Sequence, residues 1–265
     1  MSMKDRVVVI TGASAGIGAV LAEQIGRRGA RVVLVARREV ELGEVAGRAG
    51  SEAVPVVADV TRREEVQRVL DVALGRFGGV DVWINNAGRG ISRVVSELTD
   101  ADFDEMMLVN VKSALYGMQV VLPHFRARGR GHIINISSML GRVPFAPIRS
   151  AYSAAKHALN ALSANLRMEL RASDPGIQIS VVHPGVVATE FGLRALHGGP
   201  DSRQLPNAQP PEAVAEVIAG VIENPRADVY TFPGAQKVVA GYFAAEDMAA
   251  FEAQSPFGAP PPRRP

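Results

Sequence analysis

The chain has no cysteine among its 265 residues. Disulfides, thiolate nucleophiles and sulfur-bound zinc or iron–sulfur centres are therefore excluded. Long apolar runs are also missing: none approaches the roughly 20 residues that a membrane-spanning helix needs. The first residues are polar and form no apolar leader, so we expect a cytoplasmic protein without a membrane span.

The chain also lacks a strong charge of either sign. Its 29 Lys and Arg residues face 27 Asp and Glu residues, which leaves a net charge of +2, and the arginines are scattered among the acids. A nucleic-acid partner is therefore not expected. The histidines show no spacing typical of metal ligands, so no metal is predicted; they are His124, His132, His157, His183 and His197.

Hydrophobic residues make up 47% of the chain, which is enough for one large core. We expect a single domain over residues 1–250 and a flexible, proline-rich tail over 251–265. Apolar, β-branched runs alternate with segments of helical length; these runs cover 7–10, 31–36, 53–58, 80–85, 132–137, 178–183 and 228–232. The alternation predicts an α/β fold: one Rossmann-like, doubly wound sheet of seven parallel strands with helices on both faces.

Ligands of such sheets bind beyond the carboxyl ends of the strands. Five residues that could carry chemistry fall just past a predicted strand end, and one cleft could collect them all: Gly12, Asp59, Asn86, Ser138 and Pro184.

The run at 7–10 breaks into Thr11-Gly12-Ala13-Ser14-Ala15-Gly16-Ile17-Gly18 and then into a helix-like segment. A strand at 31–36 follows at the spacing of a βαβ unit. Glycines in this position allow a tight turn and a close approach of the backbone to a pyrophosphate, which the amides of the helix N-terminus then bind. The spacing Gly-x-x-x-Gly-x-Gly differs from the usual dinucleotide fingerprint, Gly-x-Gly-x-x-Gly.

Tyr152 and Lys156 are four residues apart, so on a helix they lie on one face. A nearby ammonium favours the phenolate and lowers the pKa of a phenol from its ordinary value near ~10. The pair therefore indicates proton transfer beside a carbonyl or an alcohol.

Together these residues resemble the short-chain dehydrogenase/reductase superfamily of the Tyr-x-x-x-Lys type, and the resemblance runs from about Lys4 to Thr189. Further motifs agree in order and spacing: Ala58-Asp59-Val60, Asn85-Asn86-Ala87-Gly88, Asn110, Ser138, and Pro184-Gly185 followed by Thr189. Fourteen positions separate Ser138 from Tyr152, where thirteen is commoner in the family, so Ser137 is an alternative source of the active hydroxyl.

The resemblance implies hydride transfer between C4 of a nicotinamide and a substrate carbonyl, with Asn110, Ser138, Tyr152 and Lys156 as catalytic residues. Tyr152 would give or take the proton, and Ser138 would hydrogen-bond the substrate oxygen. Lys156 would lower the pKa of Tyr152 and bind the nicotinamide ribose, while Asn110 would hold a relay water. For Asn110 the alternative is a polar residue satisfied by backbone groups.

The resemblance also assigns the cofactor site. Ala36 stands where NAD-preferring members carry Asp, and Arg37 follows as in NADP-preferring members, so NADP(H) is predicted and NAD(H) is possible. Arg37 and Arg38 could otherwise be ordinary loop charges, and Asp59 could simply cap the next helix. The predicted contacts are Gly12, Ser14, Ala15, Gly16, Ile17, Gly18, Arg37, Arg38, Asp59, Val60, Asn86, Ala87, Gly88, Tyr152, Lys156, Pro184, Gly185, Val187 and Thr189.

Segments 89–95, 139–149 and 190–209 are expected to surround the substrate. The second contains Leu140, Val143, Phe145 and Ile148, which suit an apolar ketone, aldehyde or alcohol or merely pack the loop. Gly198-Gly199-Pro200 indicates a lid, with His197 in it near the substrate.

Relatives pair through two long helices, expected here near 102–128 and 150–172, so a homodimer or homotetramer is expected. The stripe of Ala154, Ala158, Leu162 and Leu166 could belong to that interface or to the core. Two other functions remain open: a cofactor-binding redox sensor or scaffold without turnover, and an epimerase or dehydratase. An epimerase or dehydratase usually has a larger C-terminal domain than this chain has.

Overall fold

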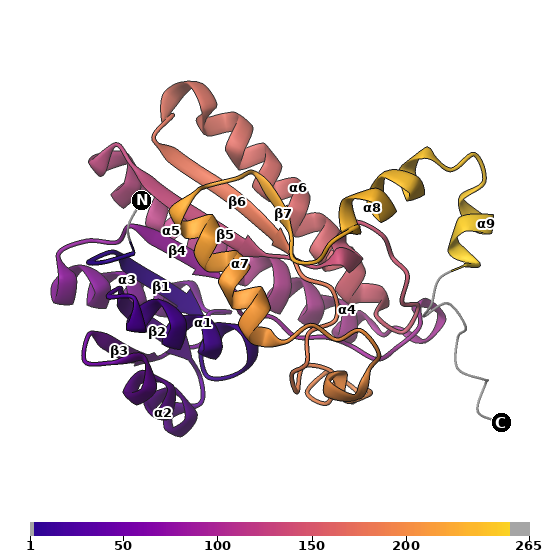
Figure 1. Cartoon of the computed structure of the whole chain (residues 1–265), viewed down its shortest axis with the longest axis horizontal. Helices are drawn as coiled ribbons and strands as arrows, with labels where there is room; N and C mark the ends of the chain where they lie inside the picture. The colour runs from indigo at the N-terminus through magenta and orange to yellow at the C-terminus, as the bar shows by residue number, and fades with distance from the viewer. Residues whose placement is uncertain (1–2, 255–265) are drawn as a thin grey trace.

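The computed structural model describes residues 3–254 and shows one sheet with the strand order β3-β2-β1-β4-β5-β6-β7 (Figure 1). Every neighbouring pair is parallel. The prediction of a seven-stranded, doubly wound sheet is confirmed. The strands are β1 Val7–Thr11, β2 Arg31–Ala36, β3 Ala53–Val57, β4 Val82–Asn85, β5 Gly131–Ile136, β6 Ile177–His183 and β7 Asp228–Tyr230.

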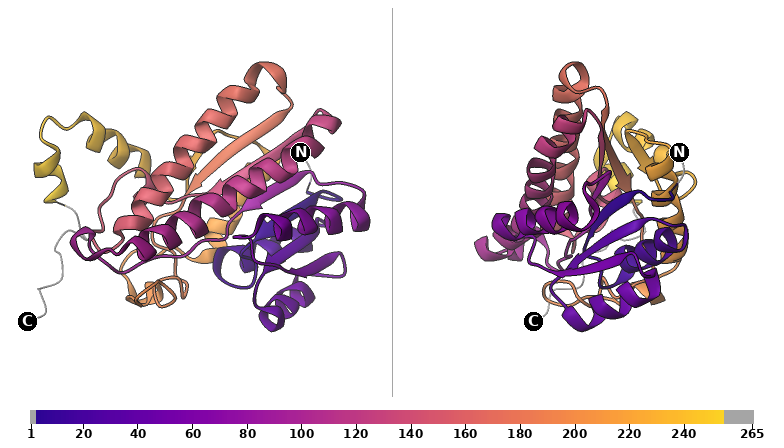
Figure 2. Two further views of the ribbon diagram at one scale, coloured as in Figure 1. Left: turned by 180° about the vertical axis from the view of Figure 1, so that it is seen from behind. Right: turned by 90° about the vertical axis from the view of Figure 1, so that its left-hand side faces the viewer.

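Helices cover both faces of the sheet (Figure 2). One face carries α1, α2 and α7, and the other carries α3, α5 and α6. The helices are α1 Gly16–Arg27, α2 Glu39–Ala49, α3 Arg63–Phe77, α4 Asp100–Met107, α5 Ser113–Arg128, α6 Ser150–Ser173, α7 Pro211–Glu223, α8 Ala235–Ala244 and α9 Met248–Glu252. None of the helices between residues 3 and 254 is long and apolar enough to cross a membrane.

The strand residues divide between two cores because successive side chains of a strand point to opposite faces. In β1, Val8 and Ile10 pack with α1, α2 and α7, whereas Val7 and Val9 pack with α3, α5 and α6. All four are buried. Burial on both faces explains why the strands read as continuous apolar runs.

The long helix expected near 102–128 is in fact two helices. Thr99 caps α4 by accepting from the backbone N–H of Asp102 at 3.2 Å, and a π-helical turn, Leu108–Lys112, then joins α4 to α5. A π-turn holds one residue more than an α-turn, so it rotates the side chains within it. Asn110 lies in this turn.

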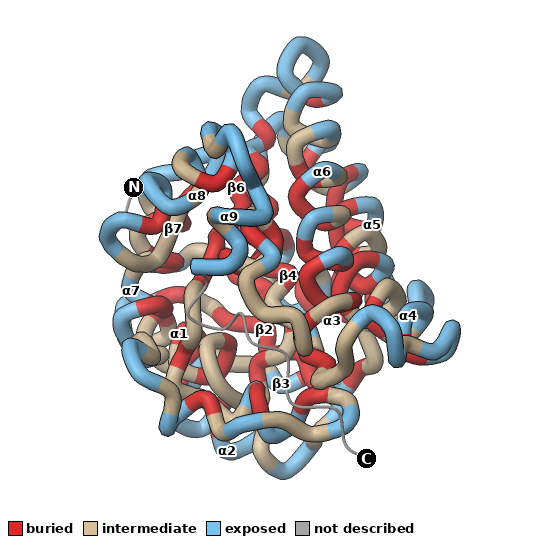
Figure 3. The backbone as a smooth tube through the Cα atoms, turned by 90° about the vertical axis from the view of Figure 1, so that its right-hand side faces the viewer, coloured by how far each residue is buried: buried red, intermediate tan, exposed pale blue. Residues whose placement is uncertain are grey.

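The C-terminal part differs slightly from the prediction. β7 ends at Tyr230 rather than at residue 232, and α8 and α9 follow as a mostly exposed extension (Figure 3). Phe251, the first residue of the expected tail, belongs to α9 and stacks on Phe145 with the ring centroids 5.8 Å apart. The rest of that tail, from residue 255, lies outside the described residues.

Candidate active site

The glycines of the turn between β1 and α1 allow a ligand to approach the backbone closely. Gly12 and Gly16 have φ angles of 68° and 57°, which glycine adopts without strain. A Cβ on Gly18 would lie only 2.5 Å from the carbonyl oxygen of Gly12. Ala15 provides no side-chain cap for α1, so the first amides of this helix remain available to an anion such as a phosphate.

Thr11 and Asn86 fix the shape of this turn. The Thr11 hydroxyl accepts from the backbone N–H groups of Asn86 and Ala87, both at 3.0 Å. The Asn86 side-chain amide donates to the carbonyls of Thr11 at 2.8 Å and Gly12 at 3.2 Å. Asn86 therefore ties the end of β4 to the glycine turn, and its predicted contact with a cofactor stays a prediction.

Two arginines follow β2, and they behave differently. Arg38 reaches back to the glycine turn, where its guanidinium donates to the Ser14 hydroxyl at 2.9 Å while also pairing with Glu41 at 2.9 Å. Arg37 is exposed. The turn therefore has a cation beside it, held by Ser14 and Glu41.

Asp59 follows β3 and stabilises the local turn. Its Oδ1 accepts from the backbone N–H of Thr61 at 3.0 Å and from the Thr61 hydroxyl at 2.8 Å, and its own N–H donates to Glu65 at 2.7 Å. This is close to the capping role considered from the sequence, although α3 itself begins at Arg63.

Asn110 is buried, with 1% of its surface exposed, and is satisfied by backbone groups. Its amide donates to the carbonyls of Arg89 at 3.0 Å and Met106 at 3.1 Å, and its oxygen accepts from the N–H of Arg89 at 3.1 Å. Its Oδ1 and the Lys156 ammonium lie 2.9 Å and 3.6 Å from the point where a Cβ on Gly88 would stand. Asn110 therefore lies near Lys156, and Gly88 leaves the space between them open.

Ser138 and Ser137 face different neighbours. The Ser138 hydroxyl interacts with the Tyr152 phenol and accepts from the backbone N–H of Leu140 at 3.1 Å. The Ser137 hydroxyl instead donates to the carbonyl of Lys156 at 3.5 Å. Of the two candidates, Ser138 is the one that faces Tyr152.

Tyr152 and Lys156 lie in the first two turns of α6, with 7% and 3% of their surfaces exposed. The Lys156 ammonium donates to the carbonyl of Ile136, at the end of β5, at 2.8 Å, and it lies 5.6 Å from the centre of the Tyr152 ring. The predicted pair is therefore brought together, and the end of β5 fixes the position of its lysine.

Burial dominates the acid–base properties of this pair. It raises the pKa of Tyr152 to about 12, against smaller lowering effects of Ser138 and of the Arg149 charge. Desolvation lowers the pKa of Lys156 to about 8. Loss of hydration disfavours both charged forms, and the lowering of the Tyr152 pKa by Lys156 stays a prediction.

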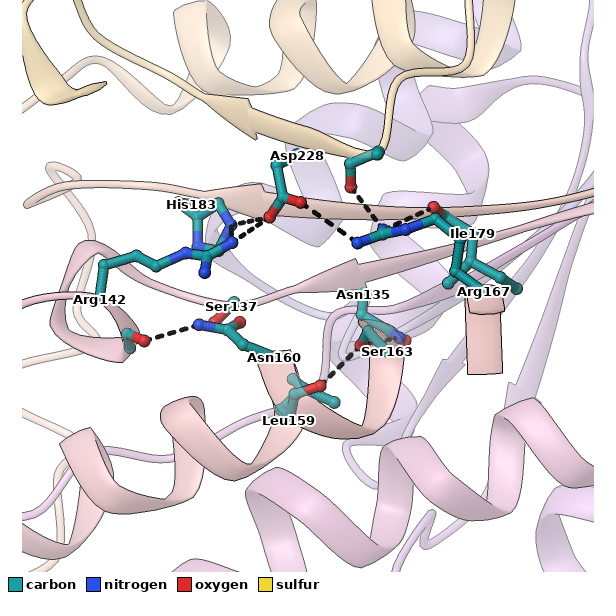
Figure 4. Close-up of polar contacts among 12 residues, drawn as sticks. Asn135, Ser137, Arg142, Leu159, Asn160, Ser163, Arg167, Ile179, His183 and Asp228 are labelled. Atoms are coloured by element: carbon teal, nitrogen blue, oxygen red, sulfur yellow. Dashed lines mark hydrogen bonds and ion pairs between the residues drawn. The ribbon is translucent and has the colours of Figure 1, made fainter. Parts of the chain in front are cut away.

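A polar framework centred on Asp228 joins β6, β7 and the segment after β5 (Figure 4). The Asp228 carboxylate accepts from His183 at 2.9 Å and pairs with Arg142, and it also pairs with Arg167 at 3.3 Å. His183 is fully buried, and its Nδ1 lies 3.4 Å from the carbonyl oxygen of Ser138. The start of β7 and the end of β6 are thereby joined to the segment that carries Ser138.

The residues after β6 lead across the glycine turn. The Thr189 methyl group lies 3.4 Å from the place of a Cβ on Gly16, and Val187 forms a bridge to Gln209. Pro184 accepts at its carbonyl from the N–H of Met139 at 2.8 Å. These contacts bring the segment of Pro184, Gly185, Val187 and Thr189 to the same strand ends as the glycine turn and Ser138.

The segment at 190–209 covers the site and is held in place by hydrogen bonds to neighbouring parts of the chain. Leu196 exchanges backbone hydrogen bonds with the 90–92 segment at 2.8 and 2.9 Å. His197, with φ at 64°, reaches Asp102 of α4 at 2.6 Å, so it binds a neighbouring helix. This hydrogen bond is the main reason that the pKa of Asp102 falls to about 2.

The expected apolar substrate wall is only partly formed. Leu140 packs beside Tyr152, but Val143 and Phe145 pack with the C-terminal helices, as the packing alternative for this loop proposed. Phe191, which was not singled out in the sequence, contacts the Tyr152 ring with the centroids 5.5 Å apart. The sequence indicates a role for Phe191 only through its position in segment 190–209, which is expected to surround the substrate.

The fold and the site define a doubly wound α/β protein with a dinucleotide-type glycine turn at the same strand ends as a buried serine, tyrosine and lysine. Between residues 3 and 254, no group of three or more His, Asp or Glu residues could hold a metal ion.

Comparison with known proteins identifies the family. The family model for short chain dehydrogenase matches residues 6–196. The uncharacterized oxidoreductase YxnA of Bacillus subtilis (strain 168) is 36% identical over 235 residues, which cover 86% of this chain and 65% of that protein. The chain therefore spans about two thirds of the length of this relative.

Two solved structures are similar over nearly their whole length. A short chain dehydrogenase/reductase from Burkholderia phymatum, in complex with NAD, superposes with a TM-score of 0.84 at 26% identity, covering 98% of this chain and 99% of that one. A short chain dehydrogenase from Burkholderia cenocepacia J2315, in complex with NADP, gives a TM-score of 0.80 at 29% identity, covering 98% and 100%. The chain belongs to the short-chain dehydrogenase family.

Proposed function

We propose that the protein is an NADP(H)-dependent oxidoreductase that interconverts a ketone or aldehyde and the corresponding alcohol. The observation that carries this proposal is the meeting of Ser138, Tyr152 and Lys156 at the carboxyl edge of the sheet, next to the glycine turn. Family membership supports the same class of reaction.

The residues present fit a nicotinamide dinucleotide. Cβ atoms on Gly12 and Gly18 would collide with the backbone, and the open amides of α1 suit a pyrophosphate. Thr189, beyond the turn, would bind the carboxamide, and Lys156 would bind the nicotinamide ribose. When bound, this cofactor supplies or accepts the hydride.

Each side chain has a separate task in the reduction. The hydroxyl of Ser138 donates to the substrate oxygen as negative charge develops on it. Tyr152 is a neutral phenol at neutral pH, and burial raises its pKa further, so it can donate the proton that completes the alcohol. Lys156 and Asn110 lie close to each other beside Gly88, and a relay through them would return a proton to Tyr152.

Arg38 and Ala36 support a preference for NADP(H). A guanidinium held beside the glycine turn by Ser14 suits a 2′-phosphate, and Ala36 offers no carboxylate to a ribose 2′-hydroxyl. Similar proteins have been crystallised with NAD and with NADP, so the preference rests on these two residues.

A fluorescence titration with NADPH and NADH, followed by absorbance at 340 nm with a panel of ketones and aldehydes, tests the proposal. We expect tighter binding of NADPH and substrate-dependent loss of absorbance. Preference for NADH would contradict the role of Arg38. Binding without turnover across the whole panel would contradict the enzymatic function and favour a redox sensor.

A further inference from the structure

Arg149 directly precedes α6 and stands three residues before Tyr152, yet the chemistry described so far does not use it. It is 9% exposed, which is rare for an arginine. One nitrogen of its guanidinium, Nη1, donates to the carbonyl of Ile91 at 2.9 Å and to the hydroxyl of Ser92 at 3.2 Å.

The charge of this guanidinium is not balanced by an acid. Its recorded partners within residues 3–254 are a carbonyl and a hydroxyl, and no carboxylate contributes to its electrostatic environment. Burial accordingly lowers the pKa of Arg149. A buried cation without an anion is costly, and a ligand that brings the anion removes the cost.

Arg149 also lies at the substrate end of the site. A Cβ on Gly90 would stand 3.1 Å from its Nη1 and 3.0 Å from the Phe191 ring, which itself contacts Tyr152. Its Nη2 lies 3.2 Å from the place of a Cβ on Gly199, in the covering segment. The backbones of Gly90 and Gly199 thus pack closely against the guanidinium, which a larger residue at either position would crowd.

We infer that Arg149 binds an anionic group of the substrate, so that the substrate is a carbonyl compound or alcohol that carries a carboxylate. The inference rests on the proposed function and names its substrate class. Arg149 would use Nη2, which has no hydrogen-bond partner among residues 3–254, while Nη1 stays on Ile91 and Ser92. The carboxylate and the reacting carbonyl would lie a few bonds apart, because Arg149, at the N-cap of α6, stands only three residues before Tyr152.

Matched substrates test this. The rate of NADPH oxidation is measured with 2-, 3- and 4-oxopentanoate and with their methyl esters, for the wild type, Arg149→Met and Arg149→Lys. We expect the wild type to prefer at least one acid over its ester. Arg149→Met should lower kcat/KM for that acid by about 10- to 100-fold, mainly through KM, and leave the ester nearly unchanged. Arg149→Lys should recover part of the loss, and Arg171→Met, at an exposed arginine of α6, is the control.

A binding measurement separates the failure of this inference from the failure of the proposed function. Pentanoate and pentanamide are titrated by calorimetry into the protein saturated with NADP+. Binding of pentanoate but not of pentanamide, lost in Arg149→Met, supports the anion site even if no carbonyl is turned over. The inference is overturned if pentanoate does not bind, or if Arg149→Met affects acids and esters equally; Arg149 would then only hold the 91–92 segment.

Discussion

At the scale of single residues, desolvation shifts the pKa values of the site. Tyr152 and Lys156 are both buried, and their pKa values move to about 12 and about 8, away from their charged forms. A phenol that stays protonated is suited to donating a proton in reduction. Arg149 is the nearby cation that acts in the opposite direction on Tyr152.

Tyr152→Phe should remove the proton donor and keep the ring packed against Phe191. We expect kcat to fall by about 100- to 10,000-fold, with little change in NADPH affinity, because the hydroxyl acts on the substrate oxygen. Steady-state kinetics and fluorescence titration measure the two effects. Tyr116→Phe, on α5 beneath Arg63, is the matched control. Retained turnover in Tyr152→Phe would contradict the assignment.

At the scale of elements, the glycine turn and the ends of the strands carry the site. The turn works because β4, through Asn86, holds β1 and α1 in one geometry. Its glycines are therefore under packing constraints that an open glycine such as Gly43, in α2, does not have. This difference can be measured with a matched pair of substitutions.

Gly18→Ala places a Cβ 2.5 Å from the carbonyl oxygen of Gly12, so the turn must shift. We expect NADPH to bind at least about tenfold more weakly, and the protein to lose roughly 1–3 kcal/mol of stability. Gly43→Ala, in α2 with nothing within 4 Å of the new Cβ, should gain about 0.5–1 kcal/mol and bind NADPH normally. Urea unfolding measures the change in stability, and fluorescence titration measures the change in NADPH affinity. Equal effects of the two substitutions would contradict a packing constraint at the glycine turn.

β5 makes the fold sensitive to acid through His132. This side chain is 4% exposed, and burial lowers its pKa from 6.5 to about 3. The unfolded chain takes up a proton near pH 6.5 that the folded chain refuses, so stability is intact above pH 6.5 and falls as the pH drops toward 3.

Between pH 7 and pH 5 this histidine should cost the wild type about 2 kcal/mol. His132→Gln cannot titrate, so its unfolding free energy should fall less over the same range by about that amount. Urea unfolding at several pH values gives the difference in unfolding free energy between the two proteins. The other histidines are present in both, so their contributions cancel. Parallel pH curves for the two proteins would contradict the prediction.

At the scale of the whole molecule, α6 links the site to the surface. Leu162 and Leu166 of the predicted stripe pack into the core, whereas Ala154 is exposed. Ala161 and Met168 are exposed as well, at intervals of seven residues from Ala154, so the three lie on one face.

We expect two copies to associate through this face of α6 into a dimer or tetramer. Ala161→Glu would place two charges in such an interface and should shift the protein toward monomer in sedimentation velocity, without loss of fold by circular dichroism. Val40→Glu, at an exposed site on α2, should leave the assembly unchanged. A monomeric wild type would rule out the interface.

How much of the fold and of the candidate site could be predicted from the sequence depends on how far apart along the chain the interacting residues lie. The strands and the glycine turn follow from local composition, because parallel strands are buried on both faces and the turn needs glycine. The π-turn around Asn110 leaves no mark in composition. The contacts of Arg149 with Ile91 and of His183 with Asp228 join residues 58 and 45 positions apart, and only the folded chain reveals them.

The strand order bears on how the chain is made. β2 pairs with β1 and β3 with β2, then β4 returns to the free side of β1, and β5, β6 and β7 are added outward in turn. Every strand after β1 therefore finds a partner already synthesised when it leaves the ribosome. The sheet can therefore assemble in the direction of translation. Each new strand can pair with the sheet as soon as it has been synthesised.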